Sequence, residues 1–447
     1  MKYSKAIIST LVIAMFAISI FAAIPVRAQT TLLASGQLKV LGSSTVFPIS
    51  SAVQPLFQTY TGTLSAPFTS TTVTLNDLGS GAGIAALEGS STTPVTADIA
   101  AASKDGAAGA IFGASYPLSG THVNDPQEFM IGQDSIAIIV PATNTWLSQA
   151  SASQVSDLFA TTGNNNHIAK YATWGDWANA QVPVVSLPSG VASQPISHIG
   201  REFSAGTFDG FNTFFMKPFG RDMTYSASTG QTAGIWTTDD YQGKTANQDV
   251  LSAMQLSQNA YAIGFIGLGF VQNDLGASHP DGIIPLKMYN PTTSSYVSPS
   301  IANVKNGSYV SNSATPAVII RGLWYFMDGI PSANSAEAVK SLWISYVKSS
   351  DSFVSNDGYI TINRADMAGK ASGNPNTSVG TQTVPDGVVD FNDLVYFASA
   401  WIAYYGPTHA LNPYADMKGT GSAPDGVIDF NDLVAFANNW IAYYATH

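Results

Sequence analysis

The stretch around which the chain is organised lies near its start, where residues 41–50 read Leu41-Gly42-Ser43-Ser44-Thr45-Val46-Phe47-Pro48-Ile49-Ser50. Residues 37–41 alternate polar and apolar side chains, which predicts a short strand. From Ile49 to Tyr60 apolar residues recur at helical spacing, and Pro48 suits a first helical turn. Small hydroxyl residues therefore precede a helix N-terminus, where backbone N–H groups favour an anion. An ordinary capped turn would carry the same pattern.

Similar turns recur along the chain. Residues 72–75 predict a strand, and the glycine- and serine-rich segment 77–83 then leads into a helical pattern. Segment 97–104 is a third strand followed by a turn, and it ends in a hydroxyl and a cation. Segment 201–207 is a fourth turn, which precedes a helix rich in phenylalanine. Segment 77–83 lacks the spacing of a nucleotide-binding loop.

Composition restricts the class of protein. A chain of 447 residues is too long for one core, so we expect two or three domains. Only 11% of residues are charged and small polar residues abound, which favours an extracellular protein over a cytosolic enzyme. The net charge of −11 argues against a nucleic-acid partner. The absence of cysteine excludes disulfides and thiolate metal sites.

Residues 1–28 have the features of a secretory leader. Lys2 and Lys5 make its start basic, and residues 6–24 are uncharged and largely apolar. The apolar run is nearly long enough to span a bilayer, so an uncleaved N-terminal anchor is the alternative. Either interpretation predicts a secreted or cell-surface protein outside the cytoplasmic membrane. Residues 29–36 form a polar linker.

Residues 37–364 alternate short β-rich runs with helical runs, which indicates an α/β fold. The tail, residues 365–447, differs because it contains an internal repeat. Residues 386–395 recur at 425–434, and each copy ends in Trp-Ile-Ala-Tyr-Tyr. So close a duplication predicts a separate small domain of two related units.

Each repeat of the tail has acidic residues at the spacing of a calcium-binding loop. An Asp-Gly pair occupies the fifth and sixth positions, a valine carbonyl the seventh, and aspartates the ninth and twelfth. The predicted ligands of two Ca²⁺ ions are Asp366, Asp386, Val388, Asp390, Asp393, Asp416, Asp425, Val427, Asp429 and Asp432. The first half of each loop is longer than in a twelve-residue loop, so acidic turns that cap helices are the alternative.

This pair of loops resembles the dockerin modules, in which two calcium loops are each followed by a helix with aspartate at the twelfth position. The resemblance covers about 366–447 and implies a small all-α domain of two EF-hand-like units. In that family exposed helix faces bind a cohesin domain on another protein. The implied partner is therefore a cohesin-like or surface protein.

Five segments of residues 37–364 resemble, in the same order, the phosphate-binding proteins of ABC transporters: 42–48, 79–83, 97–104, 201–207 and 262–265. The resemblance implies a type II periplasmic-binding-protein fold, with two α/β lobes joined by two crossover strands and the ligand between them. One lobe would combine about 37–128 with 271–364, and the other would be about 129–270.

The resemblance also implies which residues contact the ligand. Hydroxyl and backbone N–H groups of the turns would surround an oxyanion, and Arg201 would be the one charged clamp. The implied set is Ser44, Thr45, Val46, Phe47, Ser80, Gly81, Ala82, Ser103, Arg201, Gly206 and Thr207. The alternative for Arg201 is a surface residue paired with Glu202.

One motif departs from the family. Many relatives read Arg-Glu-Asp-Gly-Ser-Gly-Thr where this chain has residues 201–207, so an acidic residue and a serine are replaced by Phe203 and Ala205. An acidic acceptor lets a site prefer protonated phosphate over fully ionised sulfate, because a buried acceptor left unpaired is costly. Asp98, Glu202 or Asp209 would have to serve here, or the anion is sulfate, tungstate or molybdate.

The sequence shows no catalytic constellation. The histidines lack metal-site spacing, and no nucleophile elbow occurs. We therefore predict a non-enzymatic solute-binding protein that captures an oxyanion, foremost phosphate, for an ABC transporter permease, with a calcium-dependent interaction module. The main alternative is a structural protein of the cell surface or of an extracellular complex, which uses the receptor fold as a scaffold and the tail for assembly. A surface hydrolase recruited by its tail is a second alternative.

Overall fold

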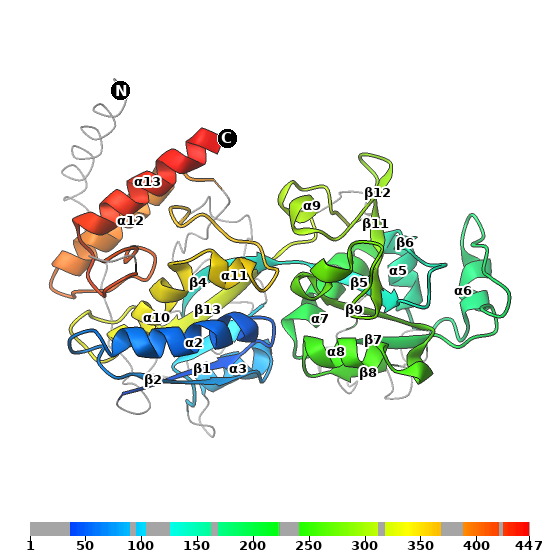
Figure 1. Cartoon of the computed structure of the whole chain (residues 1–447), viewed down its shortest axis with the longest axis horizontal. Coiled ribbons are helices and arrows are strands. Elements are labelled where there is room, and N and C mark those ends of the chain that lie inside the picture. Colours follow the sequence, from blue (N-terminus) through cyan, green and yellow to red (C-terminus); the bar gives the residue numbers. More distant parts are fainter. Residues whose placement is uncertain are drawn as a thin grey trace.

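The structure is a computed structural model, and it describes residues 36–89, 95–103, 126–161, 169–221, 223, 241–311, 318–367, 388–419 and 423–446. Two α/β lobes lie side by side, and a pair of helices from the tail lies on the first lobe (Figure 1). The predicted leader lies outside the described residues. No helix among the described residues is long and apolar enough to cross a membrane.

The first lobe is built on a five-stranded sheet with the order β2-β1-β3-β13-β4. Its strands are β1 (Gln37–Gly42), β2 (Thr72–Asn76), β3 (Ile99–Ala102), β4 (Pro126–Asp134) and β13 (Arg321–Asp328). β1 pairs in parallel with β2 and β3, whereas β13 runs antiparallel to β3 and β4. The carboxyl ends of β1 and β3 therefore lie at one edge of the sheet.

The helices of the first lobe are α2 (Phe47–Thr61), α3 (Ser80–Glu88), α10 (Ala338–Lys348) and α11 (Ser352–Ser355). The helix predicted with Pro48 in its first turn is α2, which begins at Phe47. It buries Ile49, Val53 and Phe57, and the ring of Phe57 meets that of Trp343 on α10 edge-on at 5.1 Å. The buried face of α2 thus packs the helix onto the lobe, with its N-terminus close to the carboxyl end of β1.

The second lobe contains a five-stranded sheet with the order β10-β5-β9-β7-β8. Its strands are β5 (Ile136–Pro141), β7 (Ser197–Arg201), β8 (Tyr241–Lys244), β9 (Ala262–Gly267) and β10 (Ile283–Pro285). A smaller sheet joins β6 (Gln149–Ala150), β11 (Lys287–Asn290) and β12 (Ser295–Val297). β7 pairs in parallel with β8 and β9, so Arg201 ends its strand beside Lys244.

The second lobe has short helices, of which α7 (Gly206–Phe211) and α8 (Asn247–Met254) pack on the five-stranded sheet; the others are α5 (Ala152–Leu158), α6 (Trp174–Ala180) and α9 (Ile301–Lys305). A π-helical turn (Asn212–Met216) continues α7, and 3₁₀ turns span Lys217–Phe219, Ser257–Asn259 and Leu268–Asp274. The phenylalanines predicted after residues 201–207 pack here, and the rings of Phe211 and Phe265 stack 4.0 Å apart.

Two crossovers join the lobes. The chain first passes from β4 to β5 through Ser135, and it returns at 318–321 into β13. The predicted return at about 271 is wrong, because β10 pairs antiparallel with β5 in the second sheet. The chain after β9 therefore remains in the second lobe, where β10 adds a strand to the sheet and Ile283 and Ile284 are buried.

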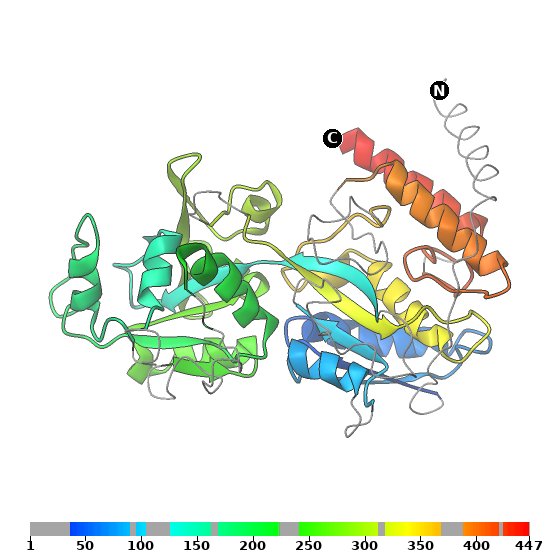
Figure 2. The same ribbon diagram turned by 180° about the vertical axis from the view of Figure 1, so that it is seen from behind.

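The tail forms two helices, α12 (Phe391–Tyr405) and α13 (Phe430–Thr446), which lie side by side in both views (Figures 1 and 2). Phe397 and Phe436 occupy equivalent positions of the repeat, and their rings stack at 5.2 Å. The segment between the helices packs on the first lobe, and Leu411 and Tyr414 belong to the same apolar core as α2. The tail therefore shares a core with the first lobe.

Candidate functional site

The predicted turns of the first lobe meet at its boundary with the second lobe. Ser43 Oγ donates to Ser103 Oγ at 3.1 Å, and the backbone N–H of Ser103 donates to Ser80 Oγ at 3.1 Å. Ser43 follows β1, Ser103 follows β3, and Ser80 is the first residue of α3. Their convergence results from the parallel pairing of β1 and β3, whose carboxyl ends meet at one sheet edge, where ligands of open α/β sheets bind.

The second lobe contacts this cluster through the N-terminus of α7. Thr45 Oγ1 and Thr207 Oγ1 are 3.3 Å apart, and the N–H of Gly81 donates to the carbonyl of Ser204 at 3.3 Å. A Cβ on Gly206 would lie 2.4 Å from Ser103, so only glycine fits there. The two lobes are thus closed upon each other through polar groups.

Arg321 lies at the centre of the cluster, and sequence reasoning missed it. Its Nη1 donates to the carbonyl of Ser103 at 3.2 Å, and its Nη2 donates to Thr207 Oγ1 at 3.0 Å and to Thr45 Oγ1 at 3.4 Å. The same guanidinium forms a fully buried ion pair with Asp134. The predicted single charged clamp is therefore wrong, because a second guanidinium joins the site.

Arg321 and Asp134 are opposite each other in the register of β13 and β4, and each is next to a crossover. A signal for them exists in the sequence. Each is a charge at one end of a strand with an apolar middle, and such a charge is rarely buried without a partner. The pair therefore fixes a guanidinium where the two lobes join.

Arg201 lies at the end of β7 and is only 1% exposed, so the alternative of a surface residue is wrong. Its Nε donates to the carbonyl of Lys244 at 2.9 Å, and its Nη2 donates to that of Thr245. Its Nη1 is buried and has no hydrogen-bond partner among the described residues. Burial, together with the positive charge of Arg321, lowers the pKa of Arg201 to about 10.

Asn247 is the first residue of α8 and a second residue that sequence reasoning missed. It is 1% exposed, and its Nδ2 donates to Thr45 Oγ1 at 3.4 Å. Its Oδ1 is buried, and no described residue donates to it. The site thus contains a buried donor on Arg201 and a buried acceptor on Asn247 that the described protein groups leave unsatisfied.

The first turn differs from the prediction in its backbone. The N–H of Thr45 donates to Ser43 Oγ at 3.1 Å, and those of Val46 and Phe47 donate to the Ser43 carbonyl at 3.1 and 2.9 Å. The expectation that these N–H groups are free for an anion is therefore wrong, because the turn uses them to close itself. Ser44 lies in that turn, and Ala82 lies in the first turn of α3.

The predicted proton acceptors differ in where they lie: Glu202 borders the cluster, with Oε1 3.2 Å from the position of a Cβ on Gly79, whereas Asp98 does not. Asp98 precedes β3, at the opposite end of that strand from Ser103, and accepts from the N–H of Lys39 at 2.8 Å. Glu202 accepts from Ser204 Oγ at 2.9 Å. Asp209 lies in the first turn of α7. Phe203, which replaces the family's acidic residue, packs edge-on against Phe208 at 4.9 Å.

The predicted calcium ligands in the tail are engaged with backbone. Asp432 Oδ1 accepts from the N–H groups of Met417 and Lys418 at 2.6 and 2.7 Å, and Asp393 Oδ1 accepts from Met367 in the same way. Both loops thus repeat one geometry. No three acidic or histidine side chains in the described part of the chain are placed to hold a metal, and Asp386 lies outside that part.

The acidic side chains of the second loop lie close together. Asp416 accepts from the N–H groups of Asp425 and Gly426 at 3.2 and 3.1 Å. Burial, and then the charges of Asp432 and Asp425, raise the pKa of Asp416 well above its usual value. Burial raises the pKa of Asp432 to about 7. Asp390 and Asp429 accept from the N–H groups at the starts of α12 and α13.

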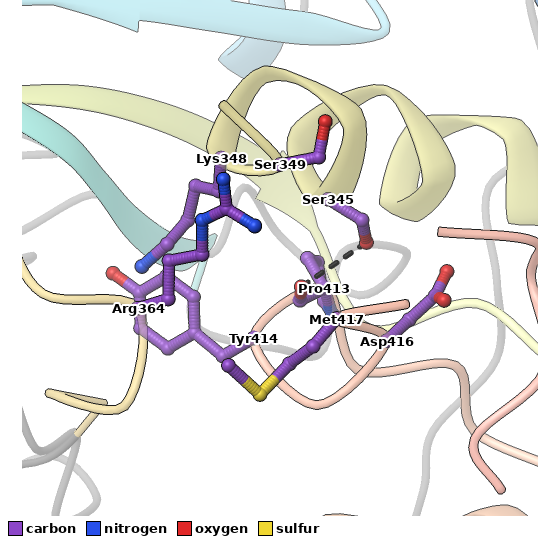
Figure 3. A pocket seen from close by; sticks show the side chains of 8 residues that line it. All are labelled: Ser345, Lys348, Ser349, Arg364, Pro413, Tyr414, Asp416 and Met417. Carbon is purple, nitrogen blue, oxygen red and sulfur yellow. Dashed lines mark hydrogen bonds between the residues drawn. The ribbon is translucent and has the colours of Figure 1, made fainter. Parts of the chain in front are cut away.

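A pocket lies where the tail meets α10, separate from the residues between the lobes (Figure 3). Its lining includes Lys348, Arg364 and Tyr414, and Ser345 Oγ donates to the carbonyl of Pro413 at 3.1 Å. The ammonium group of Lys348 lies 3.6 Å from the centre of the Tyr414 ring. This pocket marks the junction of the tail and the first lobe.

The family described as PBP superfamily domain matches residues 28–333, more than half of the chain. The chain therefore belongs to this superfamily, whose members are binding proteins rather than enzymes, and its two lobes have the α/β architecture predicted. A search of curated proteins finds no match.

Several solved structures are similar. A putative phosphate ABC transporter substrate-binding protein with bound phosphate from Clostridium perfringens is 21% identical, with a TM-score of 0.47, and covers 73% of this chain and 99% of its own. An ABC-type phosphate transport receptor from Vibrio cholerae is 19% identical, with a TM-score of 0.44, and covers 72% and 99%. The family assignment depends on the family match alone.

Proposed function

We propose that the protein captures a tetrahedral oxyanion, foremost hydrogen phosphate, between its lobes. The observation that carries the proposal is the buried charge between the lobes. Two guanidinium groups, those of Arg201 and Arg321, lie near each other, and Asp134 pairs with only one of them. The carboxylates of Glu202 and Asp249 also act on Arg201, but neither is hydrogen-bonded to its Nη1, which no described residue engages. Burying an uncompensated charge is costly, and an oxyanion would supply the missing negative charge.

The chemistry of the surrounding groups suits such a ligand. Hydrogen bonds can be donated by the hydroxyls of Thr45, Ser103 and Thr207 and by Nη1 of Arg201, which no described residue engages. Donors from two lobes around one anion would hold the lobes together. Because Thr45 and Thr207 are 3.3 Å apart, an anion would enter between them only after the lobes separate.

We propose that the anion-bound form delivers its ligand to an ABC transporter permease from a position outside the cytoplasmic membrane. The protein would be secreted, or tethered to the cell surface if the leader is not cleaved. The structural alternative, in which the receptor fold is only a scaffold, predicts no anion binding. Titration calorimetry of the purified protein with phosphate, sulfate and tungstate distinguishes the two functions.

We expect binding of at least one of these anions, and we expect the variant Arg201→Met to lose it. The matched control is Arg221→Met, because Arg221 pairs with Asp157 in the second lobe, apart from the cluster between the lobes. Absence of heat with all three anions would favour the scaffold alternative. Equal binding by wild type and Arg201→Met would show that the anion binds elsewhere.

We propose further that the tail is a calcium-dependent interaction module of the dockerin type. The support is the repeated geometry of its two loops and the mutual repulsion of the buried carboxylates of Asp416 and Asp432 with the half-buried Asp425. Calcium would neutralise these charges. To bind it, the carboxylate oxygens would first have to give up the hydrogen bonds that they accept from backbone N–H groups. Addition of Ca²⁺ should raise the melting temperature of wild type, whereas Asp432→Asn should reduce this increase; no effect on wild type would contradict calcium binding.

The exposed faces of the tail helices support its role in protein binding. Equivalent apolar residues of the two repeats are exposed on the two helices: Phe391 and Phe430, Val395 and Val434, Ile402 and Ile441, and Tyr405 and Tyr444. Such a stripe on a soluble protein is typical of an interaction surface. A cohesin-like or surface protein is the proposed partner.

A further inference from the structure

The neutral side chain of Asn247 lies beside a buried ion pair. A Cβ placed on Gly267 would lie 3.0 Å from Asp134 Oδ2, 3.4 Å from Asn247 Nδ2 and 3.7 Å from Arg321 Nη2. The carboxamide thus lies beside the buried ion pair at the meeting point of the lobes. Its Oδ1 is buried, and the described residues provide no donor for it.

The carboxamide belongs to the same hydrogen-bond network as Arg321. A guanidinium can only donate hydrogen bonds, so the hydroxyls of Thr45 and Thr207 accept from Arg321. Thr45 also lies within reach of Asn247 Nδ2. In this arrangement the arginine occupies hydroxyl lone pairs, which leaves the hydroxyl hydrogens to donate, and Asn247 Oδ1 remains as a neutral acceptor.

The carboxylate of the site does not supply an equivalent acceptor. Asp134 Oδ2 accepts from Nε and Nη2 of Arg321, and its Oδ1 accepts from the N–H of Leu268 at 2.9 Å. Glu202, at the edge of the cluster, accepts from Ser204 Oγ at 2.9 Å, and its Oε1 would lie 3.2 Å from a Cβ on Gly79. Both carboxylates thus already accept hydrogen bonds from the protein, whereas Asn247 Oδ1 accepts none from the described residues.

We propose that Asn247 sets the proton requirement of the ligand, an inference that rests on the proposed function. Oδ1 would accept the hydrogen of hydrogen phosphate. Rotation of the carboxamide by 180° would instead present Nδ2 as a donor to sulfate, with the hydroxyl of Thr45 donating to Oδ1. The site therefore accepts both protonated and fully ionised tetrahedral anions, and Asn247 is a specificity-determining residue.

The test measures the ratio of the dissociation constants for phosphate and sulfate by titration calorimetry at neutral pH. Wild type should bind both anions within about tenfold of each other, the effect of about one hydrogen bond. Asn247→Asp, which places a charged acceptor at the same position, should keep phosphate binding and weaken sulfate binding by about 100-fold or more. Sulfate has no hydrogen to donate to the new carboxylate, which would stay unpaired and repel it. Asn247→Ala removes donor and acceptor and should weaken both anions to a similar extent.

The outcomes separate the two proposals. If wild type binds none of phosphate, sulfate and tungstate, the proposed function is wrong. If it binds tungstate but neither phosphate nor sulfate, the inference about Asn247 is wrong while the proposed function stands. If wild type binds phosphate and discriminates against sulfate by more than tenfold, the inference about Asn247 is wrong while the proposed function stands. An unchanged ratio in Asn247→Asp, or undiminished binding of both anions by Asn247→Ala, also overturns it. Melting temperatures of both variants show whether they are folded. If Asn247→Asp is not folded, the result for Asn247→Ala decides the question.

Discussion

Two contacts of the molecule are closed but differ in their chemistry. We call the polar contact between the lobes the cleft, and the apolar contact between the first lobe and the tail the seam. The cleft joins hydroxyls, a guanidinium and a carboxamide, as in the contact of Thr45 with Thr207. The seam joins apolar side chains in one core, including Leu411 and the ring of Tyr414, which meets that of Phe129 edge-on at 5.2 Å.

This difference indicates which contact can open. A polar group can exchange a protein partner for water or a ligand at little net cost. Exposing apolar surface costs about 25 cal/mol for each Å². We therefore infer that the cleft opens and closes around a ligand, whereas the seam remains closed in the folded protein. Three substitutions test this distinction.

The largest effect is expected for Arg321→Met in the cleft. This substitution leaves the carboxylate of Asp134 fully buried without its partner. Breaking a buried ion pair from one side costs about 3–5 kcal/mol, so the free energy of unfolding should fall by that amount. Urea denaturation measures it, and calorimetry should show that anion binding is lost.

The double variant Asp134→Leu/Arg321→Met provides the control for the cleft. Replacing both charges with apolar side chains should restore most of the stability, because neither charge remains buried. Anion binding should stay lost, since the guanidinium is absent. A double variant that binds anions would show that Arg321 only supports the fold, and a fully stable single variant would show that the pair is not buried.

At the seam we expect Tyr414→Ala to lower the free energy of unfolding by about 3 kcal/mol, as truncation of a buried aromatic ring does. Tyr414 is buried, and its hydroxyl is hydrogen-bonded to the backbone of Met130. The matched control is Tyr405→Ala on α12, where the ring is 58% exposed and the effect should stay within about 0.5 kcal/mol. Equal effects of the two variants would contradict a permanently docked tail.

The comparison also shows which features the sequence could predict. The turns with Thr45, Ser103 and Thr207 are local signals, because each follows or precedes a regular element with clear spacing. Arg321, Asp134 and Asn247 carry no motif, and they reach the site only through the crossovers and the order of the strands. Local patterns do not determine that order.

The lobe boundaries show the same limit. The return crossover could not be located because β10 has only three residues and no alternation that separates it from a loop. Its place is decided by pairing with β5, a contact between residues far apart in sequence. The docking of the tail was missed for a similar reason, since Tyr414 precedes a repeat unit whose own pattern predicts a separate domain.

The smallest expected effect concerns Lys348 at the seam. Its ammonium group is buried, and within the described ranges it has no hydrogen-bond partner, although it lies over the Tyr414 ring. Burial lowers the pKa of Lys348 from 10.5 to about 7. Between these values the native state binds fewer protons than the unfolded state, so stability should increase as pH rises. From pH 7 to pH 9 we expect Lys348 to contribute a gain of about 2 kcal/mol. This gain is measured as wild type minus Lys348→Met, because the raised pKa values of Asp416 and Asp432 make their own contribution of opposite sign in both proteins.

Lys348→Met should abolish this gain and be more stable than wild type at pH 7, because no charge is then buried at the seam. Lys305→Met is the control, since Lys305 is exposed on α9, and it should keep the wild-type dependence on pH. Urea denaturation at pH 7 and pH 9 measures all three proteins. If Lys348→Met keeps the full gain, the dependence on pH arises from other groups. The ammonium group of Lys348 is then not a buried charge that lowers stability at the seam.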